Sequence, residues 1–280
     1  MVEQYQKPAP APGVYHDVPF DRYQKWDAWN PSRIKTLVQK SARALRYELD
    51  NGHESTPSMD LGRATHTLIL EPDKFAERYA IYDGDGTRAS KDFKAFAEAN
   101  ADKEVFKVNE IDNALGMASA INADPVSGPI IARQARHEVS VVWQSSGLLC
   151  KGRIDRLEDD GSITDLKTCA DPYPRKFGMS VVEFGYHLSL GAYRAGLRSN
   201  GVQVPAARFI AVQNKPPYEV VVYEVSAETL AFGNDEWIAG LQRVKHCLAT
   251  GIWPGYETQA VPFFLPEWAV PESQVTYGDE

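Results

Sequence analysis

A short segment with two aspartates placed symmetrically about a turn is the feature that most constrains this chain. The segment is GRIDRLEDDGSITDLKT, residues 152–168, in which EDDG joins two runs typical of β-strands. If the turn is centred on Asp160, Asp155 and Asp165 lie opposite one another in an antiparallel hairpin. Opposed residues share a face of the sheet, with Cβ atoms about 4.5–5.5 Å apart. Two carboxylates in that arrangement repel unless a cation lies between them.

Lys167 belongs to the same predicted cluster. It lies two residues beyond Asp165 and therefore points to the same face, whereas Leu166 points away but can offer its backbone carbonyl to a metal. Hard oxygen ligands suit Mg²⁺ or Mn²⁺, and a bound metal lowers the pKa of its water while a lysine orients or deprotonates that water. The cluster predicts phosphodiester hydrolysis. The alternative is a surface hairpin with an Asp–Lys pair, because D-x-K alone occurs often by chance.

The remaining pattern predicts an α/β fold, with a central mixed β-sheet flanked by helices. One helix is expected from the N-cap Asn30 to Asn51-Gly52, and a second begins with Asp60 as N-cap and ends before Pro72. Further helices are expected near 90–100, 109–123, 181–198 and 226–249, and strands near 137–143, 148–157, 162–169, 208–213 and 218–225.

The predicted organisation is an N-terminal arm, residues 1–29, followed by a single domain, residues 30–280, with core motifs at 60–198. Residues 1–14 are too proline-rich for a helix and are expected to be flexible or docked. No apolar run of about 18 residues is present, so no membrane span is expected. The N-terminus carries acidic and proline residues where a signal peptide has its apolar core, which favours a cytoplasmic location.

Charge and cysteine content narrow the function classes. The net charge is −8, from 30 Lys plus Arg against 38 Asp plus Glu, which differs from that of a generic basic nucleic-acid binder. Local basic patches still allow phosphate contacts. Cys150, Cys169 and Cys247 form no CxxC pair and cannot supply the four thiolates of an iron–sulfur cluster, so we expect small buried side chains.

A helical G-x-x-x-H, Gly62 to His66, precedes the hairpin, and a tyrosine-bearing helix follows it. This order resembles the PD-(D/E)XK nuclease superfamily. Within it, the chain is similar to the RecE-type exonucleases, that is, the catalytic part of exodeoxyribonuclease VIII and its phage relatives. The similar segments are LGRATHTLILEPDKF (61–75), HEVSVVW and CKGRIDRL (within 137–157), ITDLKTCADP (163–172), YHLSLGAYRAGL (186–197) and IWPGYE…LPEWA (252–269).

The resemblance implies roles for particular residues. His66, Asp155 and Asp165 match metal ligands, together with the Leu166 carbonyl, and Lys167 and Tyr193 complete the catalytic set. Ser189 stands where the family has a glutamine, with His187 or Gln144 as candidate replacements. Glu138 and Ser189 are expected to support the site without binding the metal. Candidate DNA contacts, chosen from charge and position, are Arg63, Arg88, Lys91 and Arg153.

The resemblance also implies a function: Mg²⁺-dependent 5′-to-3′ degradation of linear double-stranded DNA, with Mn²⁺ as a substitute and no iron–sulfur cluster. It implies a ring-shaped homotetramer, a single-strand annealing partner for recombination, and a phage protein acting in the bacterial host cell. Two alternatives stay open. One is another nuclease of the superfamily, such as an endonuclease or a Cas4-like or AddB-like enzyme, although the latter carry four-cysteine clusters. The other is a catalytically silent DNA-binding scaffold, which Ser189 favours and the intact His66, Asp155, Asp165 and Lys167 set disfavours.

Overall fold

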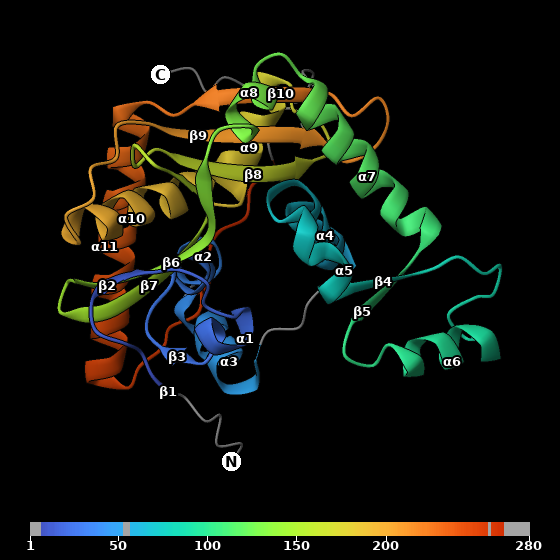
Figure 1. The fold of residues 1–280 in the computed structure, drawn as a ribbon. Helices are drawn as coiled ribbons and strands as arrows, with labels where there is room; N and C mark the ends of the chain where they lie inside the picture. Colours follow the sequence, from blue (N-terminus) through green and yellow to red (C-terminus); the bar gives the residue numbers. More distant parts are fainter. Residues whose placement is uncertain (1–6, 53–56, 257–258, 266–280) are drawn as a thin grey trace, which may run out of the picture.

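A mixed six-stranded β-sheet forms the centre of the fold in the computed structural model, which describes residues 7–52, 57–256 and 259–265 (Figure 1). The strand order is β10-β9-β8-β7-β6-β2, and β8 and β9 are parallel while all other neighbours are antiparallel. The strands are β2 (Gly13–Tyr15), β6 (Ala135–Ser145), β7 (Leu148–Glu158), β8 (Ile163–Cys169), β9 (Ala207–Gln213) and β10 (Val220–Glu224). The predicted fold class is confirmed.

Helices cover both faces of the sheet. One face packs against α2 (Pro31–Gln39), α3 (Ala42–Asn51), α9 (Pro174–Glu183), α10 (Tyr186–Ser199) and α11 (Ala227–Thr250). Trp143 of β6 and Trp237 of α11 meet in this core with ring centres 5.7 Å apart. The other face packs against α4 (Pro57–Leu70), α7 (Val108–Ala123) and α8 (Ser127–Ile131), with Leu166 and Ile210 between them.

A smaller unit projects from the main body (Figure 1). It consists of the parallel pair β4 (Tyr79–Tyr82) and β5 (Glu104–Lys107) with α6 (Lys91–Ala99) between them. The short elements η1 (Pro72–Lys74) and α5 (Phe75–Arg78) connect it to α4.

The described part of the N-terminal arm is docked on the domain. It contains β1 (Lys7–Pro8), α1 (Phe20–Gln24) and β3 (Trp26–Asp27), and its β2 pairs with β6 at the sheet edge. The ammonium group of the buried Lys151 donates to the carbonyls of Tyr23 at 2.9 Å, Gln24 at 3.0 Å and Trp26 at 2.7 Å. This side chain therefore ties the arm to β7.

Three of the predicted helix boundaries are wrong. The helix expected from Asn30 to Asn51 is broken at Lys40, because the Ser41 side chain accepts from Ala44 N and starts α3. The helix expected over 181–198 is likewise two helices, separated at Gly185, whose φ is +59°. Asp60 lies inside the first turn of α4, which begins at Pro57, and is not its N-cap.

Other expectations are met within the described residues. The three cysteines are buried, and they pack in the core on the α10 face. No helix of the described part is long and apolar enough to cross a membrane. Residues 266–269 of the LPEWA tail motif lie outside the described residues.

Candidate metal centre

The site lies where β7 and β8 separate. The two strands pair only at Arg156–Thr164 and Leu157–Ile163, a register centred on residue 160 as predicted. The ladder ends before Asp155 and Asp165. As a result, Leu166 N donates to the Asp155 side chain at 3.0 Å instead of to a backbone carbonyl of β7. Beyond the paired residues the two carboxylates stay close enough for the charge of Asp165 to raise the pKa of Asp155.

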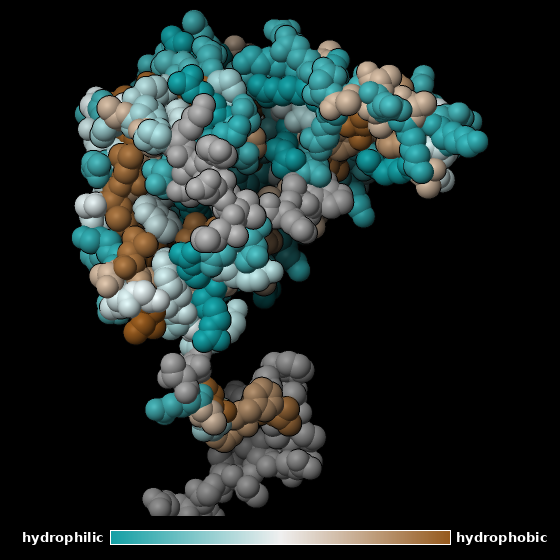
Figure 2. Space-filling model, turned by 90° about the horizontal axis from the view of Figure 1, so that it is seen from below, coloured by the Kyte–Doolittle hydropathy of each residue, from teal (hydrophilic) through white to brown (hydrophobic). Residues whose placement is uncertain are grey.

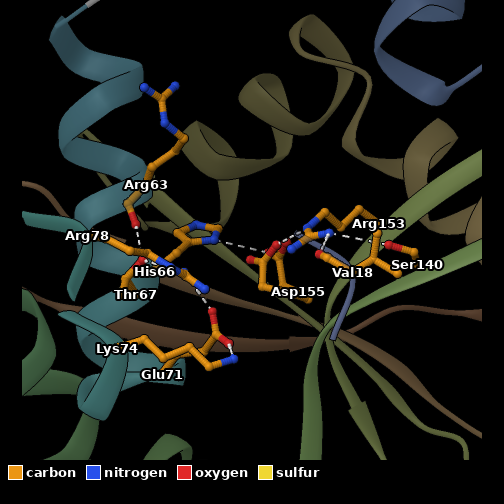
Figure 3. Close-up of polar contacts among 11 residues, drawn as sticks. Val18, Arg63, His66, Thr67, Glu71, Lys74, Arg78, Ser140, Arg153 and Asp155 are labelled. Atoms are coloured by element: carbon orange, nitrogen blue, oxygen red, sulfur yellow. Dashed lines mark hydrogen bonds and ion pairs between the residues drawn. The ribbon is translucent and has the colours of Figure 1, made fainter. Parts of the chain in front are cut away.

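His66, Glu138 and Asp155 form a cluster that could hold a metal ion. One ligand atom from each residue lies within 4.8 Å of the others, and all three side chains are partly buried. His66 projects from α4 toward Asp155, with Nδ1 3.5 Å from Oδ2 (Figure 3). The helix α4 and the consecutive strands β6 and β7 thus bring one imidazole and two carboxylates to one point.

The position of Glu138 depends on an unusual backbone conformation. His137 pairs with Arg156 and Val139 with Ile154, so Glu138 faces Asp155 across the β6–β7 ladder, yet its φ is +53°. That region is uncommon for a residue other than glycine, and such outliers gather at functional sites. Glu138 was predicted to support the site without binding the metal, and nothing in the local sequence predicts its positive φ.

Arg153 holds the Glu138 carboxylate. Its Nε donates to Glu138 Oε2, and its Nη1 donates to Val18 O at 2.9 Å and to Ser140 Oγ at 3.3 Å (Figure 3). The Phe20 and Tyr23 rings lie beside the guanidinium, at 5.7 and 5.6 Å from its carbon. The N-terminal arm therefore forms one wall of the pocket that fixes this arginine.

Asp165 and Lys167 form the second part of the site. Lys167 Nζ lies 2.5 Å from Asp165 Oδ2, an ion pair in which this oxygen has no partner with hydrogen-bond geometry. Lys167 also donates to the Leu166 carbonyl at 3.2 Å and lies 5.0 Å from the Tyr186 ring centre. The predicted convergence of Asp155, Asp165 and Lys167 is therefore present in the structure.

Burial and repulsion between carboxylates raise the pKa values of Asp155 and Glu138. Burial, followed by the charge of Asp165, raises the pKa of Asp155 to about 7. Burial and the charge of Asp155 raise the pKa of Glu138. Burial, with a smaller effect from Lys167, lowers the pKa of His66 to about 4, which keeps the imidazole neutral. For Lys167, burial lowers the pKa, but Asp165 and Asp155 outweigh it and raise the pKa above its ordinary value.

This donor set fits a divalent cation. A neutral imidazole and two carboxylates are metal ligands of the hard to intermediate class, and the buried Asp165 carboxylate, ion-paired with Lys167, lies beside them. A dication would reverse the rise in the carboxylate pKa values. Imidazole plus carboxylate accommodates several metals, including Mg²⁺, Mn²⁺ and Zn²⁺.

The residues of α10 lie around the site in different ways. Tyr193 packs against the backbone of β7: a Cβ on Gly152 would lie 2.8 Å from its Cδ1. Ser189 is buried, so the usual glutamine position faces inward. His187 bonds Glu236 of α11 at 2.6 Å, and Gln144 is exposed six residues along β6 from Glu138. A replacement of the missing glutamine by either side chain stays a prediction.

The four candidate DNA-contact residues differ in their surroundings. Arg63 lies 2.5 Å from Asp60, and Arg88 lies 2.7 Å from Glu110. Lys91 is exposed at the start of α6. Arg153 is held among the contacts described above, and its side chain is only 11% exposed. A DNA contact by any of these residues stays a prediction.

Lys35 of α2 was not predicted as a site residue, and it approaches the site from a different helix. Its Nζ lies 5.9 Å from the centre of the same Tyr186 ring that Lys167 contacts. Nothing in its local sequence, SRIKTL, marks it, because the contact depends on how α2 packs against α10.

Comparison with known proteins identifies the fold. A family model described as a PDDEXK-like domain of unknown function (DUF3799) matches residues 31–261. A crystal structure of a protein from Eubacterium rectale, provisionally named an exonuclease, is similar with a TM-score of 0.65 and 12% identity, over 90% of this chain and 97% of that chain. The structure of SSO0001 gives a TM-score of only 0.32, with 15% identity over 78% of this chain and 83% of that chain. No curated protein matches the sequence.

Proposed function

The chain belongs to the PDDEXK-like family DUF3799, and on this premise we propose that it is a metal-dependent nuclease that hydrolyses phosphodiester bonds. One observation carries the proposal. Asp155, Asp165 and Lys167 converge where β7 and β8 separate, beside the metal-capable cluster of His66, Glu138 and Asp155.

Each side chain has a role that follows from its contacts. His66, Glu138 and Asp155 would hold the metal, and the adjacent Asp165 would be a fourth donor and the third carboxylate. A bound divalent ion supplies a Lewis acid for the phosphate and lowers the pKa of water. Lys167, fixed by Asp165 and the Leu166 carbonyl, presents an ammonium donor that can orient a water or the phosphate. Arg153 keeps Glu138 in position.

The proposed substrate is linear double-stranded DNA, degraded 5′ to 3′ to leave a 3′ single strand. Mg²⁺ is the proposed metal, with Mn²⁺ able to substitute. The resemblance to RecE-type exonucleases supports these choices, as does the exonuclease name of the similar Eubacterium rectale protein. By the same resemblance, we propose a single-strand annealing protein as partner in recombination and a phage origin, with action in the cytoplasm of the host cell.

Self-association is part of the proposal, as a ring of copies around DNA. Large apolar side chains are exposed along α11, including Phe232 at 59% and Leu248 at 51%. Figure 2 shows apolar residues gathered along one edge of the main body, on the side where α11 lies in Figure 1. Burial of such side chains between copies would favour association.

The test uses linear duplex DNA labelled at the 5′ or the 3′ end, beside closed circular duplex, with Mg²⁺ or Mn²⁺. Early release of the 5′ label with an intact circle is the expected result. Early release of the 3′ label would reverse the polarity, and nicking of the circle would assign an endonuclease. DNA binding without cleavage in either metal would instead assign a silent scaffold. The variant Asp165→Asn is the matched inactive control.

A further inference from the structure

Lys35 is held near the site by the packing of its own helix. Its neighbours Ile34 and Leu37 are fully buried in the core, which fixes the rotation of α2. Its alkyl stem crosses Gly185, where an added Cβ would lie 2.9 Å from Lys35 Cδ. The absence of a side chain at Gly185 therefore leaves a passage through which Lys35 reaches Tyr186.

Two ammonium groups converge on the Tyr186 ring, but only one has a carboxylate partner. Lys167 lies beside Asp165. Across the part of the chain that the structure describes, Lys35 Nζ has no ion-pair partner, and the Tyr186 face is its one aromatic contact there. Burial, followed by the charge of Lys167, lowers the pKa of Lys35 to about 8.

A purely structural role accounts poorly for this arrangement. A lysine used only for its stem normally carries its head into water, away from other cations. Lys35 instead places its head at the Tyr186 ring that Lys167 also contacts, where the repulsion from Lys167 is larger than the attraction of either Asp165 or Asp155. A further anion bound there would stabilise this ammonium group. A metal held by His66, Glu138 and Asp155 would act with Lys167 on the bond being cleaved, which leaves the second ammonium group to bind a neighbouring anionic group.

We propose that Lys35 forms a phosphate-binding subsite, in which its ammonium group binds a non-bridging phosphate oxygen of the DNA strand at or next to the cleaved bond. This inference rests on the proposed nuclease function and names one contact of its substrate. The phosphate is either a 5′-terminal phosphate or an internal phosphodiester, since both present the same oxygens. A lysine contact of this kind positions the strand and carries no sequence preference.

The first experiment measures duplex DNA binding by fluorescence anisotropy in EDTA, so that no cleavage occurs, over a range of salt concentrations. The variants are Lys35→Ala, Lys35→Arg and the control Lys40→Ala, which removes a charge that lies 3.4 Å from Glu48. Lys35→Ala should weaken binding about tenfold. It should also reduce the slope of log K against log salt by about 0.9, the value for one phosphate contact. Lys35→Arg should largely restore both.

The second experiment locates the phosphate. Single methylphosphonate substitutions near the end of the duplex remove one phosphate charge at a time. At the contacted position, the substitution should weaken binding by the wild type but not by Lys35→Ala. Loss confined to 5′-phosphorylated ends assigns the terminal phosphate, and equal loss with 5′-hydroxyl ends assigns an internal one.

A failure of the Lys35 subsite is distinguishable from a failure of the proposed nuclease function. If the wild type cleaves DNA but Lys35→Ala matches Lys40→Ala in affinity and salt slope, the Lys35 subsite is wrong and the nuclease function stands. If Lys35→Ala loses affinity with an unchanged salt slope, Lys35 acts by packing alone, and the subsite is again wrong. If the wild type neither binds nor cleaves DNA, the proposed function itself fails.

Discussion

Glu138 and Asp155 face each other on β6 and β7, and the backbone of Glu138 has a φ of +53° at that point. A strained conformation of this type costs on the order of 1–3 kcal/mol and persists only where its surroundings hold it. Here Arg153 and the docked N-terminal arm hold the carboxylate. The strain aligns Glu138 with Asp155 and His66, which ties the local backbone to the ability to bind a metal.

Replacement of Glu138 should separate metal binding from folding. Glu138→Gln keeps the shape but removes the charge, so the affinity for Mn²⁺ should fall at least about tenfold. The thermal midpoint of the metal-free protein should be little changed, because the lost ion pair with Arg153 is offset by the lost repulsion from Asp155, and the amide oxygen still accepts from Arg153. Isothermal titration calorimetry and thermal unfolding measure the two quantities. Glu98→Gln, on the exposed side of α6, is the control, and equal Mn²⁺ affinity in both variants would remove Glu138 from the site.

Loss of Arg153 should affect both stability and metal binding. Arg153→Met leaves Glu138 partly buried without its partner, which should lower the free energy of unfolding by about 2 kcal/mol. The Mn²⁺ affinity should fall as well, since Glu138 is no longer held. Phe20→Ala should give smaller changes in the same directions, because its ring lies beside the guanidinium. The control Arg22→Met, at an exposed position, should change neither the free energy of unfolding nor the Mn²⁺ affinity. An Arg153→Met variant with wild-type stability and full Mn²⁺ affinity would contradict the role of Arg153 and of the arm that holds it.

Metal binding should depend on pH through Asp155. Its pKa is raised to about 7 in the folded protein, above the unfolded value of about 3.9, so the metal-free folded state binds more protons between these values. This group therefore stabilises the metal-free fold below about pH 4, and the contribution is lost as the pH rises through about 7. A metal must displace the proton at low pH, so Mn²⁺ should raise the thermal midpoint more at pH 8 than at pH 5.5. Calorimetry should detect proton release at pH 5.5, and equal midpoint shifts at both pH values would exclude Asp155 as a ligand.

The hairpin of the site was predictable because its information is local. A turn centred on residue 160 and the period of two in a strand suffice to bring Asp155, Asp165 and Lys167 together, and the observed register has that centre. The strands on either side were also predictable, since alternating β-branched residues mark them. The point before Asp155 at which the β7–β8 ladder ends was not predictable. It depends on how the two strands separate, where β7 continues its pairing with β6 and β8 continues its pairing with β9.

The features missed by sequence analysis depend on tertiary contacts. The helix breaks at Lys40 because Ser41 acts as the N-cap of a second helix. Helix propensity alone does not distinguish this arrangement from one continuous helix. Arg153, two strand positions from Asp155, contacts the carboxylate of Glu138 at its positive φ, and the stem of Lys35 passes Gly185 between α9 and α10. None of these relationships has a spacing that can be read along the chain.

The anchor of the N-terminal arm is testable by itself. Lys151→Met keeps the stem but leaves the carbonyls of Tyr23, Gln24 and Trp26 without their shared donor. The free energy of unfolding should fall by about 2–4 kcal/mol, as measured by urea denaturation. Limited proteolysis should cut the arm earlier than in the wild type. Lys25→Met, at an exposed ion pair with Asp21, should change neither, and a stable Lys151→Met would show that the β2–β6 pairing and the Arg153 contacts are sufficient to hold the arm.

Variants of the Asp165–Lys167 pair separate the effect on the cleavage rate from the effect on stability most clearly. Asp165→Asn and Lys167→Met should each lower the cleavage rate by about a thousandfold, the scale of a lost proton-transfer or charge-stabilising group. Each should also destabilise the protein, because a partly buried charge is left without its partner.

The double variant Asp165→Asn/Lys167→Met should recover most of the lost stability, since neither charge is then left unpaired, but should stay inactive. Thermal unfolding and single-turnover cleavage with Mn²⁺ complete the cycle. Cleavage at the wild-type rate in either single variant would remove the pair from the chemistry. Recovery of cleavage together with stability in the double variant would show that the pair acts only on folding, and that the catalytic groups lie elsewhere in the cluster.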